Sequence, residues 1–495
     1  MSLSTKTSWG RLPSEIRLII LEVLLQDGCS LAGLATVSRE WQAIIERHNF
    51  ARIKVTPSRL ANFNYMLHRN QALVSYIWLC LELQEYDCTH RWGISNTDNI
   101  LIVTAFQDLF SSLSSWKPYG NLLLDISVYS PSDSKNWKHW INYLTFGPYM
   151  SSGELEQDRY IQKPFLSEFD DTQHSWIAGS QESPLNCLAD DKVFDEIMGE
   201  GPFDDEEQEN QWWLQLPLVP VVTGVLLRQQ DRRRWKLKTL SLMFSHFPRL
   251  QEIHYEPWME WDDIIQRWTD ESYQSLFKQF ASYKLRRLVV FETFNQWYLQ
   301  SFRYCAPIRI PTLDVSRTLA SATLEIEHLS ASSIVDAGHF FSTCKPSWRW
   351  PNLISLTLTS HLLTPNESTI EINDMLQRAA TVAMKMPNLQ TMEIWNGRKG
   401  LAALFRYQSI CYGGYGQRAE ITWRGTWDCA LHPSVIRAWE AVSLKHRGNG
   451  CVAIKEFLDV GVVESDGDAI YHLNLSNTVT LPPPITSNSD GAKDY

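Results

Sequence analysis

Apolar residues near the N-terminus recur at helical spacing and predict three short helices between residues 12 and 54. Leu12-Pro13 opens the first helix and Gly28 ends it. The apolar positions are Ile16, Ile20 and Leu24 in the first helix, Leu31 and Leu34 in the second, and Val37, Trp41, Ile44 and Ile45 in the third. Three short helices enclose only a small core, so a module of this kind leaves apolar surface for a partner helix.

A different pattern follows, in which short apolar strands of the form L-x-x-L-x-L recur. The clearest lie at 250–255, 285–290, 353–358 and 389–394, a weaker one at 323–329, and earlier candidates at 74–79, 123–128 and 222–227. Two pairs of neighbouring strands start 35 and 36 residues apart, and the 68 residues from 285 to 353 fit two such periods. Helical patterns at 233–247, 271–283 and 372–386 fill the gaps.

One strand and one helix per repeat predict an α/β fold, with an irregular leucine-rich-repeat-like solenoid over residues 55–400. The alternative is an ordinary α/β domain built of βα units. The repeat fades after residue 400, where 401–480 predict an α+β region that caps the solenoid. Within this region Pro433 opens a helix and 469–475 form a final strand. We expect residues 481–495 to be a disordered tail.

Acidic residues are concentrated in one segment. Residues 151–210 hold seventeen Asp and Glu against three Lys and Arg, a local charge of −14, whereas the whole chain carries −11. This segment predicts an insertion in the solenoid. A basic run from Arg228 to Lys238 follows it, for which a solvated helix face, pairing with the acidic insertion, and an import or nucleic-acid signal are the alternatives. The sequence shows no continuous basic face, so nucleic acid is an unlikely partner.

Composition limits the chemistry. The chain is 44% hydrophobic with 21 Trp, which indicates a folded protein. Its nine cysteines include no C-x-x-C and indicate reduced thiols, hence a cytoplasmic or nuclear location. No apolar run reaches eighteen residues, so we expect no membrane partner. No nucleophile, metal or phosphate-binding motif is present, so we expect no catalytic residue, metal or cofactor.

The N-terminal motifs carry a family resemblance. Residues 10–54 resemble an F-box, with an LP-x-E-I-x-x-x-I opening, an L-x-x-V-S-x-x-W centre, and trailing Phe50 and Ile53. An F-box binds the adaptor Skp1, which connects it to a cullin and a RING subunit for ubiquitin transfer. The resemblance implies a core and Skp1-facing surface made of Leu12, Pro13, Ile16, Ile20, Leu31, Val37 and Trp41. The alternative is an ordinary N-terminal helical cap.

Strand periodicity predicts where a target would bind. Side chains that alternate with the buried leucines point to the concave face of a solenoid. Exposed aromatic and charged residues are typical of interface hot spots. The candidates are Trp78, Glu252, His254, Arg287, Phe291, Glu393 and Trp395. An error of one residue in register would place every one of these side chains on the opposite face of the strands, in the core.

The chain as a whole resembles fungal F-box proteins with degenerate leucine-rich repeats. This resemblance implies a non-catalytic substrate receptor of a Skp1–cullin–F-box ubiquitin ligase. Its partners would be a Skp1-like adaptor, through it a cullin, and an unidentified target protein. The alternatives are an interaction scaffold without ubiquitin transfer, and an enzyme whose site no motif reveals.

Overall fold

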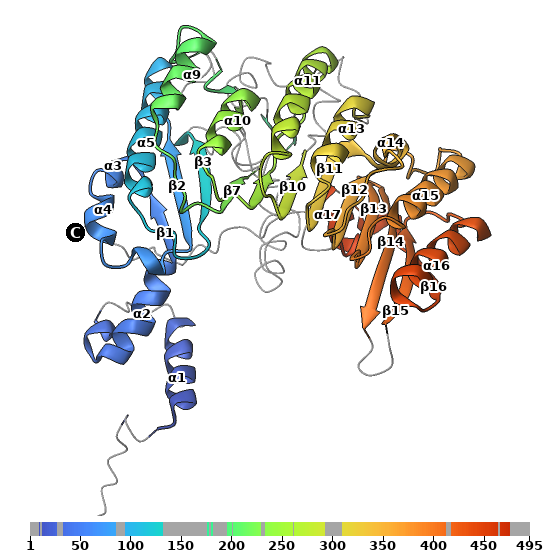
Figure 1. The fold of residues 1–495 in the computed structure, drawn as a ribbon, viewed down its shortest axis with the longest axis horizontal. Helices are drawn as coiled ribbons and strands as arrows, with labels where there is room; N and C mark the ends of the chain where they lie inside the picture. The colour runs from blue at the N-terminus through green and yellow to red at the C-terminus, as the bar shows by residue number, and fades with distance from the viewer. Residues whose placement is uncertain are drawn as a thin grey trace, which may run out of the picture.

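The computed structural model describes residue 9 and residues 12–26, 33–85, 95–131, 176–177, 180–181, 196–199, 201–228, 233–260, 262–292, 309–411, 417–463 and 466–475. These residues form a mixed α/β fold around a 12-stranded sheet (Figure 1). The predicted α/β class is therefore confirmed. None of the described helices is long and apolar enough to cross a membrane.

The strands of the large sheet follow one another in sequence order, each beside the next. They are β1 (Arg52–Val55), β2 (Tyr76–Glu82), β3 (Leu123–Tyr129), β7 (Gly224–Leu227), β9 (Glu252–Tyr255), β10 (Arg287–Phe291), β11 (His328–Asp336), β12 (Ser355–Thr359), β13 (Thr391–Arg398), β14 (Leu401–Cys411), β15 (Gln417–Gly425) and β16 (Cys451–Phe457). The strands from β1 to β13 are parallel, whereas β14 is antiparallel to both of its neighbours. Two small sheets pair β4 (Trp176–Ile177) with β5 (Ser180–Gln181) and β6 (Glu196–Ile197) with β8 (Arg234–Trp235).

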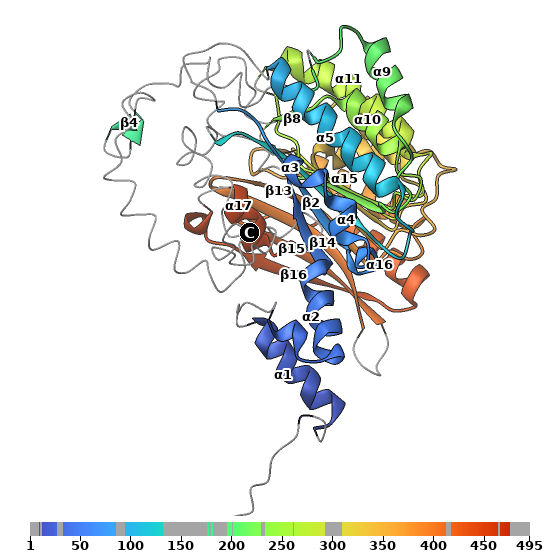
Figure 2. The same cartoon turned by 90° about the vertical axis from the view of Figure 1, so that its left-hand side faces the viewer.

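Helices cover one face of the sheet, which we call the helix face (Figures 1 and 2). They include α5 (Asn96–Ser114), α10 (Leu237–Ser245), α11 (Asp263–Phe280), α13 (Leu313–Ala322), α14 (Ala337–Thr343), α15 (Thr369–Ala383) and α16 (Pro433–Arg447). We call the opposite side the inner face. Helix α17 (Asp466–Leu473) covers this face at strands β13 and β14 (Figure 2).

A single ladder of apolar side chains fixes the register of the sheet. Its members are paired from strand to strand and almost fully buried on the helix face: Ile77, Leu124, Val225, Ile253, Leu288, Leu329, Leu356 and Met392. They include the central apolar residue of each clear L-x-x-L-x-L strand. Burial of this ladder against the helices supplies the main core, since buried apolar area is the largest stabilising term.

Three predicted elements differ from the structure. The strand expected at 323–329 begins only at His328, because the Thr323 hydroxyl donates to the Leu319 carbonyl (2.8 Å) while the chain is still ending α13. The helix expected from 233 begins at Leu237, because residues 234–235 pair with β6. The strand expected at 469–475 overlaps α17 instead. The predicted tail at 481–495 lies outside the described residues.

The N-terminus forms a helical unit that projects from the β1 end of the sheet (Figure 1). It consists of α1 (Ser14–Gln26), the 3-10 turn η2 (Leu34–Thr36) and α2 (Arg39–Ala51). Helix α2 continues into β1 without a linker. The short elements α3 (Pro57–Leu60), α4 (Phe63–Leu67) and η3 (Gln71–Leu73) follow β1, and an ion pair between Arg69 and Glu46 connects this region to α2.

Candidate functional site

The helical unit is held together by a small set of contacts around α2. Leu21 of α1 and Ile45 of α2 are fully buried, and the two helices pack together. Ser38 is the N-cap of α2, and its hydroxyl accepts a hydrogen bond from the Trp41 amide (3.3 Å). This bond gives a physical reason for the Ser of the V-S-x-x-W motif, since the hydroxyl of an N-cap residue satisfies an otherwise unpaired backbone amide of the helix.

Side chains of Trp9 and α1 make further contacts with α2. The rings of Trp9 and Trp41 lie 5.1 Å apart. The Glu40 carboxylate accepts hydrogen bonds from the Trp9 indole (3.1 Å) and the Arg17 guanidinium (2.8 Å). Trp9 and the α1 residue Arg17 are therefore both bonded to Glu40 of α2.

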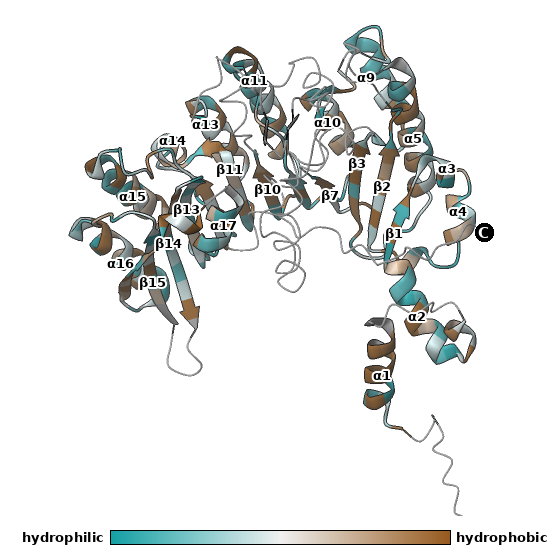
Figure 3. Ribbon diagram, turned by 180° about the vertical axis from the view of Figure 1, so that it is seen from behind, coloured by the Kyte–Doolittle hydropathy of each residue, from teal (hydrophilic) through white to brown (hydrophobic). Residues whose placement is uncertain are grey.

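The outer side of α1 carries an apolar stripe. Ile16, Ile19 and Val23 are 43%, 52% and 51% exposed, and their spacing of three and four residues places them on one face of the helix. Val37, in the turn before α2, is 61% exposed. Apolar residues therefore extend along the whole of α1 (Figure 3). An exposed apolar stripe of this kind is typical of a surface that a partner covers.

The structure divides the residues predicted to contact Skp1. Pro13, Ile16 and Val37 are exposed, whereas Leu12, Ile20 and Trp41 are half-buried within the unit. Leu31 lies outside the described residues. Sequence reasoning missed Leu18, Ile19 and Val23, which are exposed. The sequence contains the information needed to find them, because these residues form a second set of apolar positions in the first helix, beside Ile16, Ile20 and Leu24.

All seven residues predicted for target binding lie on the inner face of the sheet. Trp78, His254 and Glu393 belong to one row across the strands, and Glu252 pairs with Arg287 in the row beside it. Phe291 and Trp395 lie two residues further along their strands. The predicted alternation is therefore correct, because the apolar ladder on the helix face fixes it.

Exposure differs from the prediction for four of the seven. His254, Phe291, Glu393 and Trp395 are buried, so they are not surface positions. Glu393 accepts hydrogen bonds from Arg406 (2.8 Å) and from Thr357 (3.2 Å). Phe291 and Trp395 belong to an apolar cluster with α17. Sequence periodicity gives the face of a strand but not what covers that face.

His254 illustrates the effect of burial. Loss of solvent, with Arg287 and Arg228 as neighbouring charges, lowers the pKa of the His254 imidazole to about 3. This histidine is therefore neutral at physiological pH and carries no charge to a ligand.

The other three predicted target-binding residues remain partly accessible on the inner face. Trp78, Glu252 and Arg287 are half-buried. The Lys54 ammonium lies 4.8 Å from the centre of a Trp78 ring, and the Trp78 indole donates to the Ser127 hydroxyl (2.9 Å). These residues are the remaining candidates for target contact on this face.

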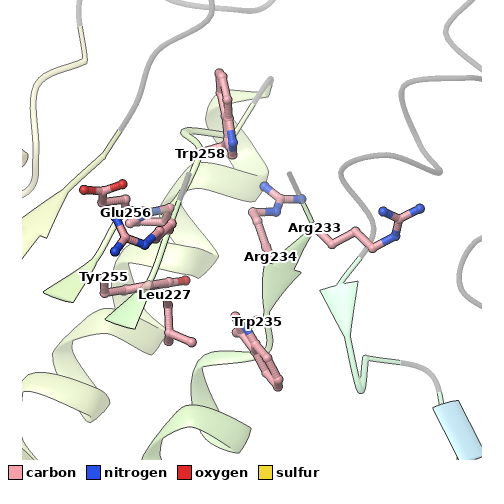
Figure 4. Close-up of a pocket in the computed structure, with 9 residues that line it drawn as sticks. Leu227, Arg233, Arg234, Trp235, Tyr255, Glu256 and Trp258 are labelled. Atoms are coloured by element: carbon pink, nitrogen blue, oxygen red, sulfur yellow. The ribbon is translucent and has the colours of Figure 1, made fainter. Parts of the chain in front are cut away.

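A pocket at the carboxyl ends of β7 and β9 gathers three arginines, with Trp235 and Trp258 among its other lining residues (Figure 4). Arg228 donates to Asp125 (2.7 Å) and Arg234 pairs with Glu260. The lining also contains Glu256. Because carboxylates already pair with Arg228 and Arg234, these two arginines do not form a free anion-binding site.

Two lysines of the basic run pair with the acidic insertion. Lys236 binds Glu209 (2.8 Å) and Lys238 binds Glu206 (2.5 Å), both on α9 (Glu206–Gln215). Glu209 is almost fully buried and also accepts from Thr239 (2.5 Å). Of the alternatives, pairing with the insertion is therefore the one observed for these two lysines.

A second buried ionic cluster lies beside α11. Arg309 pairs with Asp270 and with Glu292, and Gln266 donates to Asp270 (3.2 Å). Burial raises the pKa of the Glu292 carboxyl to about 7 and also raises that of Asp270. Glu292 does not line the pocket of Figure 4, so this perturbed acid is not joined to a site that a substrate enters there. Among the described residues no group of three or more potential metal ligands occurs.

Comparison with known proteins adds one finding. Residues 280–480 match a family of unknown function, DUF6546. This match extends from the end of α11 past α17 and does not include the helical unit. No curated protein matches the chain.

Proposed function

We propose that this protein is the substrate-recognition subunit of a Skp1–cullin–F-box ubiquitin ligase. The observation that supports the proposal most is the exposed stripe of Ile16, Ile19 and Val23 on a helical unit that projects from the sheet. The stripe belongs to the segment with the F-box motifs. As part of such a ligase the protein would act in the cytoplasm or nucleus.

Burial of apolar surface would drive the docking of Skp1. Each side chain of the stripe still exposes about half of its area, so covering it contributes about 1 kcal/mol per residue. The protein would catalyse no reaction itself. It would hold a target on the accessible part of the inner face, near Trp78 and Arg287, and raise the effective concentration of the target near the ubiquitin-loaded enzyme.

A pull-down with purified Skp1 and cullin tests the proposal. The Ile19→Asp/Val23→Asp variant places two carboxylates on the stripe, and we expect at least a tenfold loss of Skp1 recovery. Ile370→Asp is the matched control, because Ile370 is an exposed isoleucine at the start of α15. Unchanged recovery of Skp1 with the double variant would refute the docking model.

The second candidate is a scaffold that binds Skp1 without ubiquitin transfer. The same unit would then recover Skp1, but no cullin would join the complex. A reconstituted ubiquitination reaction separates the two, since only the ligase subunit supports ubiquitin chains on a bound protein.

A further inference from the structure

The inner face carries a small apolar cluster that is separate from the main core. The sheet supplies Phe291, Trp395, Ala402 and Leu404. The C-terminal segment supplies Val463, Ala469, Ile470, Leu473 and Leu475. The two clusters share no residue, so α17 packs on a part of the sheet that is separate from the main core.

Some of the contacts that hold α17 involve backbone carbonyls and do not depend on the side chains of the helix. It packs on β13 and β14. Arg424 donates to the His472 carbonyl in the last turn of the helix (3.3 Å), and Arg406 donates to the Asn474 carbonyl just after the helix ends. Backbone carbonyls at a helix C-terminus lack intrahelical partners, and cations are favourable there. Any helix of the same direction presents such carbonyls, whatever its side chains.

One contact is selective. A Cβ atom placed on Gly397 would lie 2.6 Å from the Cβ of Ala469, so the helix approaches β13 through two small residues. A larger side chain at either position prevents this approach. The exposed Tyr471, in contrast, contributes its ring to the solvent side of α17.

We propose that this cluster is a helix-binding site and that α17 occupies it as an intramolecular ligand. The partner that fits is a short amphipathic helix of the target protein, with a small residue in the place of Ala469. This inference rests on the proposed function, in which the inner face receives the target. Helix-in-groove recognition uses apolar residues on one face of the ligand helix, as Ala469, Ile470 and Leu473 are arranged here.

The same arrangement makes binding conditional. A helix of eight residues is not stable by itself in water, so α17 is helical because it is docked. A tethered ligand acts at high effective concentration, and a target helix must compete with it. Release of α17 uncovers Phe291 and Trp395, two residues that strand periodicity assigns to target binding.

Hydrogen exchange of the intact wild-type chain tests whether α17 detaches. We expect the α17 amides to exchange at least a hundredfold faster than the buried amides of α16, since local opening needs no global unfolding. Equal exchange rates in α17, α16 and β14 would mean that α17 opens only with the whole domain, and the inference would fail.

A labelled peptide of residues 464–478 tests the site directly. The full-length Ile470→Asp/Leu473→Asp variant frees the site, and we expect it to bind the peptide at least tenfold more tightly than wild type. A peptide with Ala469→Trp should lose at least tenfold in affinity, whereas a Tyr471→Ala peptide should bind unchanged. Equal binding of the peptide to wild type and variant, or no binding to either, would overturn the proposal. Skp1 recovery plays no part in these measurements, so their failure is distinct from failure of the proposed function.

Discussion

The Nε atom of Arg228 donates a 2.7 Å hydrogen bond to Oδ2 of Asp125, a carboxylate with no exposed surface. The hydroxyl of Tyr76 donates to the same oxygen (2.5 Å). Three consecutive strands of the sheet region, β2, β3 and the end of β7, are thereby joined by one buried charge. A buried carboxylate is tolerated only with such partners.

Arg228→Leu should therefore lower the free energy of unfolding by about 3–5 kcal/mol, because it leaves the Asp125 charge without its cation. Chemical denaturation measures this loss. Arg286→Leu is the matched control: Arg286 pairs with Glu327 (2.8 Å) at the surface, where solvent screens the charges, and its loss should change stability far less than the loss of Arg228 does. The Arg228→Leu/Asp125→Asn double variant should recover part of the loss. Equal effects of the two arginine substitutions would contradict the argument.

The N-cap of α2 makes a smaller prediction. Ser38→Ala removes the acceptor for the Trp41 amide and should destabilise the helical unit by about 1 kcal/mol. Ser38→Asp keeps an N-cap acceptor and should retain wild-type stability. Hydrogen exchange of the α2 amides reports the difference, and a faster exchange in both variants would show that the cap is not the cause.

Trp395 and Trp268 should respond differently to truncation. Trp395 is buried under α17, so Trp395→Ala should lower the free energy of unfolding by about 3–5 kcal/mol. Trp268 is an exposed tryptophan on α11, and Trp268→Ala should stay within about 0.5 kcal/mol of wild type. Denaturant titration compares the two. If Trp395→Ala left stability unchanged, its place in the second cluster would be wrong.

His361 predicts a dependence of stability on pH. Its Nδ1 lies 2.7 Å from the Asp336 carboxylate, and this hydrogen bond raises the pKa of His361 above its usual 6.5. The folded state therefore binds the proton more tightly than the unfolded state does. The resulting stability is fully present below pH 6.5 and is lost as the pH rises through the folded-state pKa.

The His361→Gln variant removes this titration. The stability difference between wild type and variant should be larger at pH 6 than at pH 8.5, as measured by thermal unfolding at matched ionic strength. His432→Gln is the control, because the His432 ring lies at the surface and hydrogen-bonds the Ser434 hydroxyl (2.7 Å) instead of a carboxylate. A difference that does not change with pH would remove the ion pair as its cause.

Local sequence patterns were sufficient to predict the positions of most strands and the side of the sheet to which their residues point. Large apolar residues at L-x-x-L-x-L spacing produce this result locally, because strand side chains alternate with period two. The helical periodicity of residues 12–54 likewise predicted α1, η2 and α2. Ile19 and Val23 of the exposed stripe were missed, because helical periodicity alone does not show which of two apolar sides of a helix packs inward.

Which inner-face residues are covered depends on contacts between segments that are distant in the sequence. Trp395 and Phe291 are buried by a helix that follows them by more than seventy residues, and no local pattern encodes that contact. The segment 469–475 alternates like a strand, but Ala469, Ile470 and Leu473 bury a helical face against the sheet. The lysines of the basic run bind α9 for a similar reason: the fold brings opposite charges together, whereas sequence spacing gives only their number and sign.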